Sequence, residues 1–109
     1  MESKELAKLG DALLGLMNVL GMEAGYLANE SKVTNKLLKR VSVRTGIRSL
    51  LPKRMDRRHI GNAVEAAVAY WLVAGDLSWD GILQQLKEGR GLEDALVAEI
   101  TRIDGAMVA

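Results

Sequence analysis

Residues 60–72 read IGNAVEAAVAYWL and form the most apolar segment of the 109-residue chain. Ile60, Val64, Val68 and Trp71 follow one another at spacings of three or four residues. At about 100° per residue, this spacing places them on one face of a helix. The alanines between them keep the helix surface small, which favours close packing against neighbouring helices. Gly75 is the expected end of this helix.

Helical spacing continues on both sides of this segment. Further helices are predicted over residues 3–21 (after a Ser3 cap), 22–27, 33–46 and 91–104, with one more after a Ser78 cap. The apolar stripe expected to face inward on the first helix is Leu6, Leu9, Leu13, Leu16, Met17 and Leu20, and on the last helix it is Leu92, Ala95, Leu96, Ile100 and Ile103. Because alternating strand patterns are nearly absent, the predicted fold class is all-α, a compact multi-helix bundle forming one domain over residues 1–109.

The composition excludes several classes of site. The chain has no cysteine, which rules out disulfides and thiolate ligands, and its single histidine, His59, leaves no multi-histidine metal site. It also has no phenylalanine, so the core must be built from aliphatic side chains and methionine. No apolar run approaches the ~20 residues that span a bilayer, and the charged N-terminus is unlike a signal peptide. We therefore expect a soluble cytoplasmic protein with no membrane association.

The charges are unevenly distributed, although the formal net charge is only +1. Residues 32–59 contain ten lysines and arginines and one acid, Asp56, so this segment carries +9 and the rest of the chain −8. A basic face attracts phosphate groups whatever the total charge, and a polyanionic partner is one interpretation of this pattern. The alternative is a solvated polar surface that contacts nothing.

Two carboxylates are surrounded by apolar residues in the sequence. Asp11 lies inside the first predicted helix, and Glu65 lies inside the 60–72 segment. A buried carboxylate needs a partner, because removing its charge from water costs several kcal/mol. Asn62 shares a helix face with Glu65, and carboxylate and amide oxygens of this kind suit Mg²⁺. The alternative is that each carboxylate pairs with an arginine or lies on a polar edge of its helix.

Three segments resemble motifs of the ribonuclease III catalytic-domain family. Residues 6–14, LAKLGDALL, resemble the signature helix L-E-x-L-G-D-A-x-L, and residues 33–38, VTNKLL, resemble a V-S/T-N-x-x-L segment. Residues 61–72, GNAVEAAVAYWL, are similar to the family's A-D-x-x-E-A-L-I-G-A-x-Y-L helix. The three motifs occur in the family's order and together cover roughly residues 5–75.

The resemblance implies an all-α domain that works as a symmetric homodimer and holds double-stranded RNA in a basic valley. Asp11 matches the signature aspartate and Glu65 the essential glutamate of the later helix, which would make them the catalytic residues. With Asn62 beside them, they would also be the ligands of Mg²⁺, or of Mn²⁺ in its place. The metal would activate water for in-line attack on a phosphodiester.

Three positions depart from the family pattern. Ala7 replaces the signature glutamate, Asn62 replaces an aspartate, and Lys8 stands where the family places an aromatic or large apolar residue at the dimer contact. The short mini ribonuclease III branch also lacks an acid at the first two positions and has no double-stranded RNA-binding domain. We therefore expect the chain to be closest to that branch.

The basic segment supplies the candidate RNA contacts. They are Lys53, Arg54, Arg57 and Arg58 just before the Glu65 helix, and the helical stripe Arg40, Arg44 and Arg48. Double-stranded RNA is bound largely through its phosphates and 2′-hydroxyls, which basic side chains can reach. The alternative for some of these residues is pairing with acids near the C-terminus, namely Glu93, Asp94 and Glu99. His59 is expected to bond a backbone group or a phosphate.

Three functional hypotheses follow from the sequence. The first is a metal-dependent endoribonuclease that hydrolyses phosphodiester bonds of double-stranded or structured RNA during rRNA or other RNA processing. The second is a catalytically weak or inactive relative that dimerises and binds structured RNA, its site disabled by Ala7 and Asn62. The third is a helical scaffold for protein assembly, in which the segregated charges serve subunit pairing.

Overall fold

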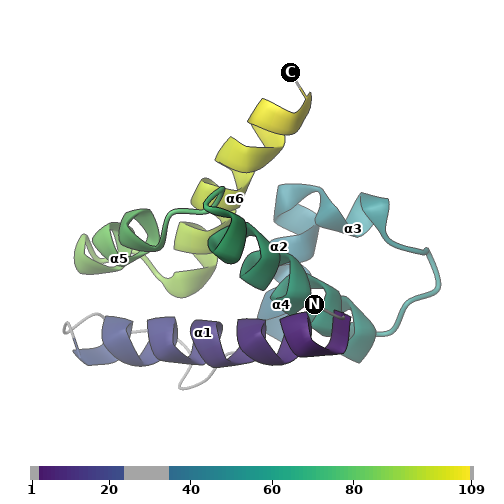
Figure 1. The fold of residues 1–109 in the computed structure, drawn as a ribbon, viewed down its shortest axis with the longest axis horizontal. Coiled ribbons are helices and arrows are strands. Elements are labelled where there is room, and N and C mark those ends of the chain that lie inside the picture. Colours follow the sequence, from purple (N-terminus) through teal and green to yellow (C-terminus); the bar gives the residue numbers. More distant parts are fainter. Residues whose placement is uncertain (1–2, 24–34, 109) are drawn as a thin grey trace.

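The computed structural model describes residues 3–23 and 35–108. Within these ranges the chain forms six helices and no strand, which confirms the predicted all-α class (Figure 1). The helices are α1 (Ser3–Glu23), α2 (Asn35–Thr45), α3 (Ile47–Leu50), α4 (Arg57–Ala74), α5 (Trp79–Lys87) and α6 (Leu92–Val108). α1 runs along the lower edge of Figure 1, with α5 at the left and α3 at the right. None of the described helices is long and apolar enough to cross a membrane.

Local residues set the ends of the helices. The carboxylate of Asp56 accepts a hydrogen bond from the backbone N–H of His59 and so caps the first turn of α4. The hydroxyl of Ser78 caps α5 in the same way, by accepting from the backbone N–H of Gly81. α4 ends at Gly75, whose φ of 84° lies in the left-handed region that a side chain would strain. The predicted Ser78 cap and the predicted end at Gly75 are therefore confirmed.

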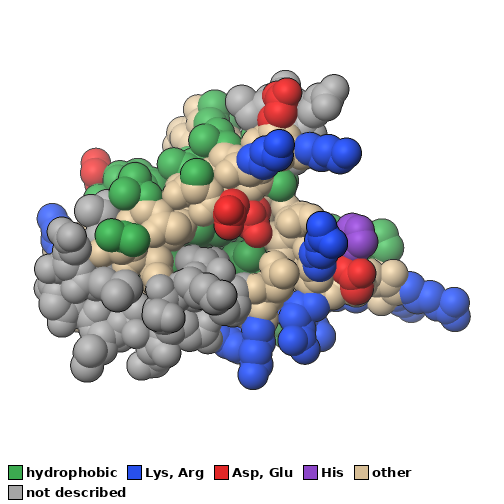
Figure 2. Space-filling model, turned by 90° about the horizontal axis from the view of Figure 1, so that it is seen from below, with side chains coloured by type: hydrophobic (Ala, Val, Ile, Leu, Met, Phe, Trp, Pro, Cys, Tyr) green, Lys and Arg blue, Asp and Glu red, His purple; other side chains and the backbone are tan. Residues whose placement is uncertain are grey.

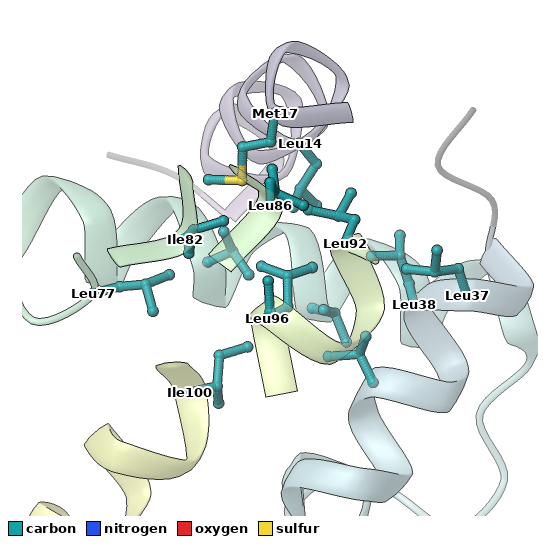
Figure 3. Close-up of a cluster of buried hydrophobic side chains, with 14 of the residues drawn as sticks. Leu14, Met17, Leu37, Leu38, Leu77, Ile82, Leu86, Leu92, Leu96 and Ile100 are labelled. Atoms are coloured by element: carbon teal, nitrogen blue, oxygen red, sulfur yellow. The ribbon is translucent and has the colours of Figure 1, made fainter. Parts of the chain in front are cut away.

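One core of aliphatic side chains joins α1, α2, α4, α5 and α6 (Figure 3). Leu14 and Met17 of α1 point into it from one side, and Leu96 of α6 lies opposite them. The other buried members are Leu37, Leu38, Val41, Val64, Val68, Leu77, Ile82, Leu86, Leu92, Ala95, Ile100 and Ile103. All five residues predicted to face inward on the last helix are among them. The core thus consists of aliphatic side chains and methionine, as expected for a chain without phenylalanine.

The buried face of α1 differs from the predicted stripe. Leu14 and Met17 are fully buried, whereas Leu16, which the stripe places inward, is 49% exposed. Leu14 and Met17 lie four and seven residues after Gly10, and the three residues share the face that packs inward. Because leucines occupy more than one face of α1, spacing alone could not show which face meets the core. The side chain of Leu20 lies outside the described residues.

The boundaries near Gly21 also differ from the prediction. α1 continues through Gly21 to Glu23, so this glycine lies inside the helix and does not end it. The rest of the helix predicted over residues 22–27 lies outside the described residues, as does the predicted start of the next helix at residues 33–34. α2 ends at Thr45, just before Gly46, which confirms the predicted end of that helix.

Candidate active site

The candidate site begins with a close approach of two helices. α1 packs most extensively against α4. A Cβ atom added at Gly10 would overlap the backbone carbonyl of Glu65, so the residue nearest α4 must be glycine for the helices to lie this close. Asp11 follows Gly10 directly. The glycine of the first motif therefore brings one predicted carboxylate to the helix that carries the other.

A hollow of about 380 Å³ lies in the groove beside this contact. Its lining residues are Lys4, Ala7, Lys8 and Asp11 of α1, with Asn62 and Glu65 of α4. Figure 2 shows the side of the molecule on which α1 lies, with acidic side chains at the middle and lysine and arginine side chains toward one end. The structure thus brings Asp11, Asn62 and Glu65 together around one space, and their binding of a metal stays a prediction.

Glu65 is the unusual group of this hollow. It is only 8% exposed, and no described residue donates a hydrogen bond to its carboxylate or forms a salt bridge with it. Burial, followed by the negative charge of nearby Asp11, raises the pKa of Glu65 to about 7. Within the described chain, pairing of Glu65 with an arginine is therefore not observed. Glu65 is thus a desolvated carboxylate beside a second acid, and none of the described basic residues forms a salt bridge with it.

The donor set of the hollow fits a hard divalent cation. Two carboxylates face a space that is open to solvent at Asp11, which is exposed, and the amide of Asn62 adds a third oxygen. Mg²⁺ takes oxygen ligands and usually retains several waters, so it needs only one or two carboxylates from the protein. No group of three or more His, Asp or Glu residues that could hold a metal occurs in the described part of the chain. The hollow therefore offers a two-carboxylate site.

Two lysines of the hollow were not among the predicted site residues. Lys4 and Lys8 line the same wall as Asp11 and are exposed. The spacing of residues 4, 8 and 11 already places their side chains on one face of a helix. The sequence contains this signal, whereas the family pattern associates the position of Lys8 with the dimer contact.

A ribonuclease III family model matches residues 4–107. The chain belongs to the ribonuclease III family. The matched region contains every residue that lines the hollow and extends through most of α6. No curated protein and no solved structure matches the chain.

In this ribonuclease III domain, part of the basic segment is bound to the protein itself. The Arg40 Nε lies 2.6 Å from a Glu93 carboxylate oxygen. An Arg44 terminal nitrogen lies 2.7 Å from Glu93 and 2.8 Å from Asp94. Burial acts to raise the pKa of Glu93, but the hydrogen bonds from both arginines outweigh it and hold the pKa below its usual value. Arg40 and Arg44 therefore join α2 to α6, which is the alternative considered for them.

Arg48 also has a structural contact. Its guanidinium donates hydrogen bonds to the backbone carbonyls of Pro52, at 3.0 Å, and Lys53, at 2.9 Å, and so holds the loop between α3 and α4. Unlike Arg48, the four basic residues of that loop and of the start of α4 have no structural contact of this kind with the described residues. Lys53, Arg54, Arg57 and Arg58 are exposed, and their side chains form no hydrogen bond or salt bridge with any described residue. These four side chains are available for a ligand.

His59 is held by the acid that caps its own helix. Its backbone N–H donates to Asp56 at 2.9 Å, and its ring Nδ1 lies 2.7 Å from the same oxygen. The backbone hydrogen bond, followed by the one from the ring, lowers the pKa of Asp56. The observed partner is thus a carboxylate side chain, in addition to the backbone contact at the cap. His59 does not line the hollow, so nothing in the geometry makes it a general base there.

Proposed function

We propose that this protein is a metal-dependent endoribonuclease that hydrolyses phosphodiester bonds of double-stranded or structured RNA during RNA processing in the cytoplasm. The observation that carries the proposal is the Asp11–Glu65 pair, an exposed and a buried carboxylate that line one hollow, with no salt bridge from a described residue to either carboxylate. Membership of the ribonuclease III family supports this class of reaction. The departures at Ala7 and Asn62 support a place close to the mini ribonuclease III branch.

The residues of the hollow have separate tasks in this proposal. Asp11 and Glu65 hold Mg²⁺, or Mn²⁺ in its place, and Asn62 orients the ligands or the waters around it. The bound cation would supply a nucleophilic water at neutral pH and offset charge on the leaving oxygen. Glu65 contributes by its position: it is buried on α4 beside α1, so its side chain has less freedom to move than that of an exposed surface acid.

The free basic residues provide the RNA contacts. Lys53, Arg54, Arg57 and Arg58 precede Glu65 in the chain, on the loop and the first turn that lead into α4. Their charges are not neutralised by described acids, apart from the proximity of Asp56 to Arg58. We assign Arg40, Arg44 and Arg48 a supporting role, because they already hold α6 and the loop. Binding through phosphates would make the affinity fall steeply with salt.

Exposed apolar side chains support a symmetric homodimer. Leu16 and Val19 of α1 are 49% and 51% exposed, and Tyr70 and Val73 of α4 are 58% and 66% exposed. On each helix these apolar residues come after the point where Gly10 meets Glu65. Lys4 and Lys8 on α1 and Asn62 on α4 come before that point. Exposed apolar residues on two packed helices are typical of a surface that a partner covers. We therefore place the subunit contact on α1 and α4.

The test is cleavage of a long RNA duplex by the purified protein with Mg²⁺ and with excess EDTA. Wild type should cleave in Mg²⁺ and not in EDTA, and Asp11→Asn or Glu65→Gln should reduce the rate at least 10²-fold, on the order expected for removal of a transition-state stabilising group. Asp76→Asn and Glu88→Gln are matched controls, because both residues are exposed and lie away from the hollow. Equal cleavage by Asp11→Asn and Asp76→Asn would contradict the assignment of the site.

A second candidate function is favoured by two uncharged residues of the hollow. Ala7 and Asn62 line it without adding negative charge, which weakens its attraction for cations. A protein with this site could bind structured RNA as a dimer without cleaving it. Salt-dependent duplex binding with no metal-dependent cleavage would favour this candidate. A dimer that does not bind RNA even at low salt would instead indicate a scaffold for protein assembly.

A further inference from the structure

We propose that Lys8, together with Lys4, binds the phosphate that is being cleaved and supplies the second positive charge of the reaction beside a single divalent cation. This inference rests on the proposed function, because it names the groups that meet the substrate in the same hollow. The observation behind it is that both lysines line this hollow together with Asp11 and Glu65.

The helix geometry places the two kinds of charge side by side. Lys4, Lys8 and Asp11 are spaced by four and three residues on α1, so they project from one face of the helix. Across the groove lies Glu65 of α4. A ligand in this space would meet acids toward one end of the wall and ammonium groups toward the other. Such a wall suits a divalent cation bound next to a phosphate group.

The charge balance favours one divalent ion and not two. Two carboxylates carry two negative charges, which one divalent cation neutralises. A second divalent cation would need further acids, and among the described residues no third one lines the hollow. A phosphodiester brings one more negative charge, and more charge develops on its oxygens as water attacks. The ammonium groups of Lys8 and Lys4 can offset this charge without needing ligands of their own.

Both lysines are available for this task. Each is exposed, and neither forms a salt bridge or a hydrogen bond with a described residue, although Lys8 is only three positions from Asp11. A lysine ammonium is a compact charge on a flexible four-carbon chain, so it can follow a phosphate oxygen into the hollow. The arginines Arg40 and Arg44, in contrast, already donate to Glu93.

The lysines act in the proposed hydrolysis through charge alone. The oxygen of water forms a bond to phosphorus as the bond between phosphorus and the leaving oxygen breaks. The water loses one proton to solvent, and the leaving oxygen takes up one proton from solvent, so the sum is the addition of one water. Lys8 stays protonated throughout and neither gains nor loses a bond.

The experiment compares Lys8→Ala and Lys4→Ala with Lys87→Ala in the full chain. Lys87 is exposed at the end of α5 and does not line the hollow, so its loss changes the net charge equally. Two quantities are measured: the affinity for Mn²⁺ without RNA, by electron paramagnetic resonance, and single-turnover cleavage of a duplex. Circular dichroism melting verifies that each variant is folded.

We expect the two quantities to change in opposite directions for Lys8→Ala. Removing a positive charge beside the cation site should tighten Mn²⁺ binding about threefold, as expected for a screened charge a few ångströms away. The cleavage rate at saturating RNA should fall about 100-fold, and Lys8→Arg should restore most of it. Lys4→Ala should show the same pattern with smaller changes, because Lys4 is a further helical turn from Asp11. A purely structural lysine would not improve metal binding while slowing cleavage.

The possible outcomes separate the inference from the proposed function. If wild type cleaves and Lys8→Ala cleaves as fast as Lys87→Ala, the inference is overturned and the endoribonuclease remains. Unchanged Mn²⁺ affinity in both lysine variants overturns it as well, because the ammonium groups would then lie away from the cation. Two Mn²⁺ ions bound per subunit would also overturn it. If wild type binds Mn²⁺ but leaves every duplex intact, the proposed function itself fails.

Discussion

Glu65 on α4 and Glu99 on α6 are both buried glutamates, with exposed fractions of 8% and 6%. Glu99 accepts a hydrogen bond of 2.7 Å from the side-chain amide of Gln85, and Arg102 lies 3.7 Å from its other oxygen. Arg90 in turn donates to the side-chain amide oxygen (Oε1) of Gln85 at 3.0 Å. For Glu65 there is no such donor among the described residues.

The difference is consistent with a structural role for Glu99 and with the functional role that we propose for Glu65. The network around Glu99 compensates its desolvation inside the protein, so the carboxylate helps to hold α5 against α6. Glu65 instead lines a hollow shared with Asp11, and burial followed by the charge of Asp11 raises its pKa, while no described residue donates a hydrogen bond to its carboxylate. Burial alone does not distinguish the two residues. The presence or absence of a protein partner does.

The largest expected effect concerns the pH dependence of stability at Glu65. The pKa of Glu65 rises from 4.5 in the unfolded chain to about 7 in the folded protein, so between these values the folded state holds more protons. Stability therefore falls as the pH rises through this range, by about 1.4 kcal/mol per unit and about 3 kcal/mol in total. Urea denaturation of metal-free wild type and Glu65→Gln from pH 4.5 to 8 should reveal this difference.

Two comparisons control that measurement. Glu88→Gln removes an exposed glutamate and should leave the wild-type pH dependence unchanged. Added Mg²⁺ should recover stability in wild type at pH 8 and not in Glu65→Gln, because a bound cation stabilises the folded state. Identical pH profiles for wild type and Glu65→Gln would mean that the Glu65 carboxylate is compensated after all, and the contrast with Glu99 would disappear.

A smaller effect is expected at Glu99. Glu99→Leu should destabilise the protein by about 2 kcal/mol, because the buried amide of Gln85 loses its acceptor. The double variant Glu99→Leu/Gln85→Leu should recover part of this loss, since neither buried member of the hydrogen bond is then left unpaired and the exposed Arg90 can be solvated by water. Chemical denaturation at pH 7 measures both. An equally stable single variant would show that the hydrogen bond contributes nothing, and RNA cleavage should be unaffected in either case.

The smallest effect is expected where charges are compensated at the surface. Arg44 is 43% exposed on its side chain and pairs with Glu93 and Asp94. Arg44→Ala should cost about 0.5–1 kcal/mol at low salt and less in 1 M NaCl, because water and ions screen such pairs. Lys36→Ala on the same helix is the matched control, since Lys36 is exposed and forms no salt bridge with another described residue. A loss that persists in high salt would indicate a packing role for Arg44.

Much of the fold was predictable from local patterns. The helix after Ser78, the end at Gly75 and the inward face of α6 follow from capping and spacing, which act within a few residues. The meeting of Asp11 and Glu65 required the motif resemblance, because nothing in either helix alone shows that the other one packs against it. The position of Asn62 beside Glu65 needed only the helical repeat.

The remaining features depend on contacts between distant segments. Arg40 is 53 residues from Glu93 in the chain. The sequence therefore allowed either an RNA contact or a salt bridge with α6 for Arg40, and could not decide between them. Leucines on several faces of α1 left its buried side ambiguous until the position of Gly10 against α4 was known. The same contact decides that Lys8 faces the hollow with Asp11.

The contact between Gly10 and the Glu65 carbonyl also limits how this site can evolve. The separation of the two helices at that point is fixed by backbone atoms in van der Waals contact, with no side chain between them that selection could shorten or lengthen. Substitutions around the hollow can add or remove charge, as at Ala7, Lys8 and Asn62, while the backbone frame of Asp11 and Glu65 stays the same. A change of charge at these positions therefore does not require the two backbones to move apart.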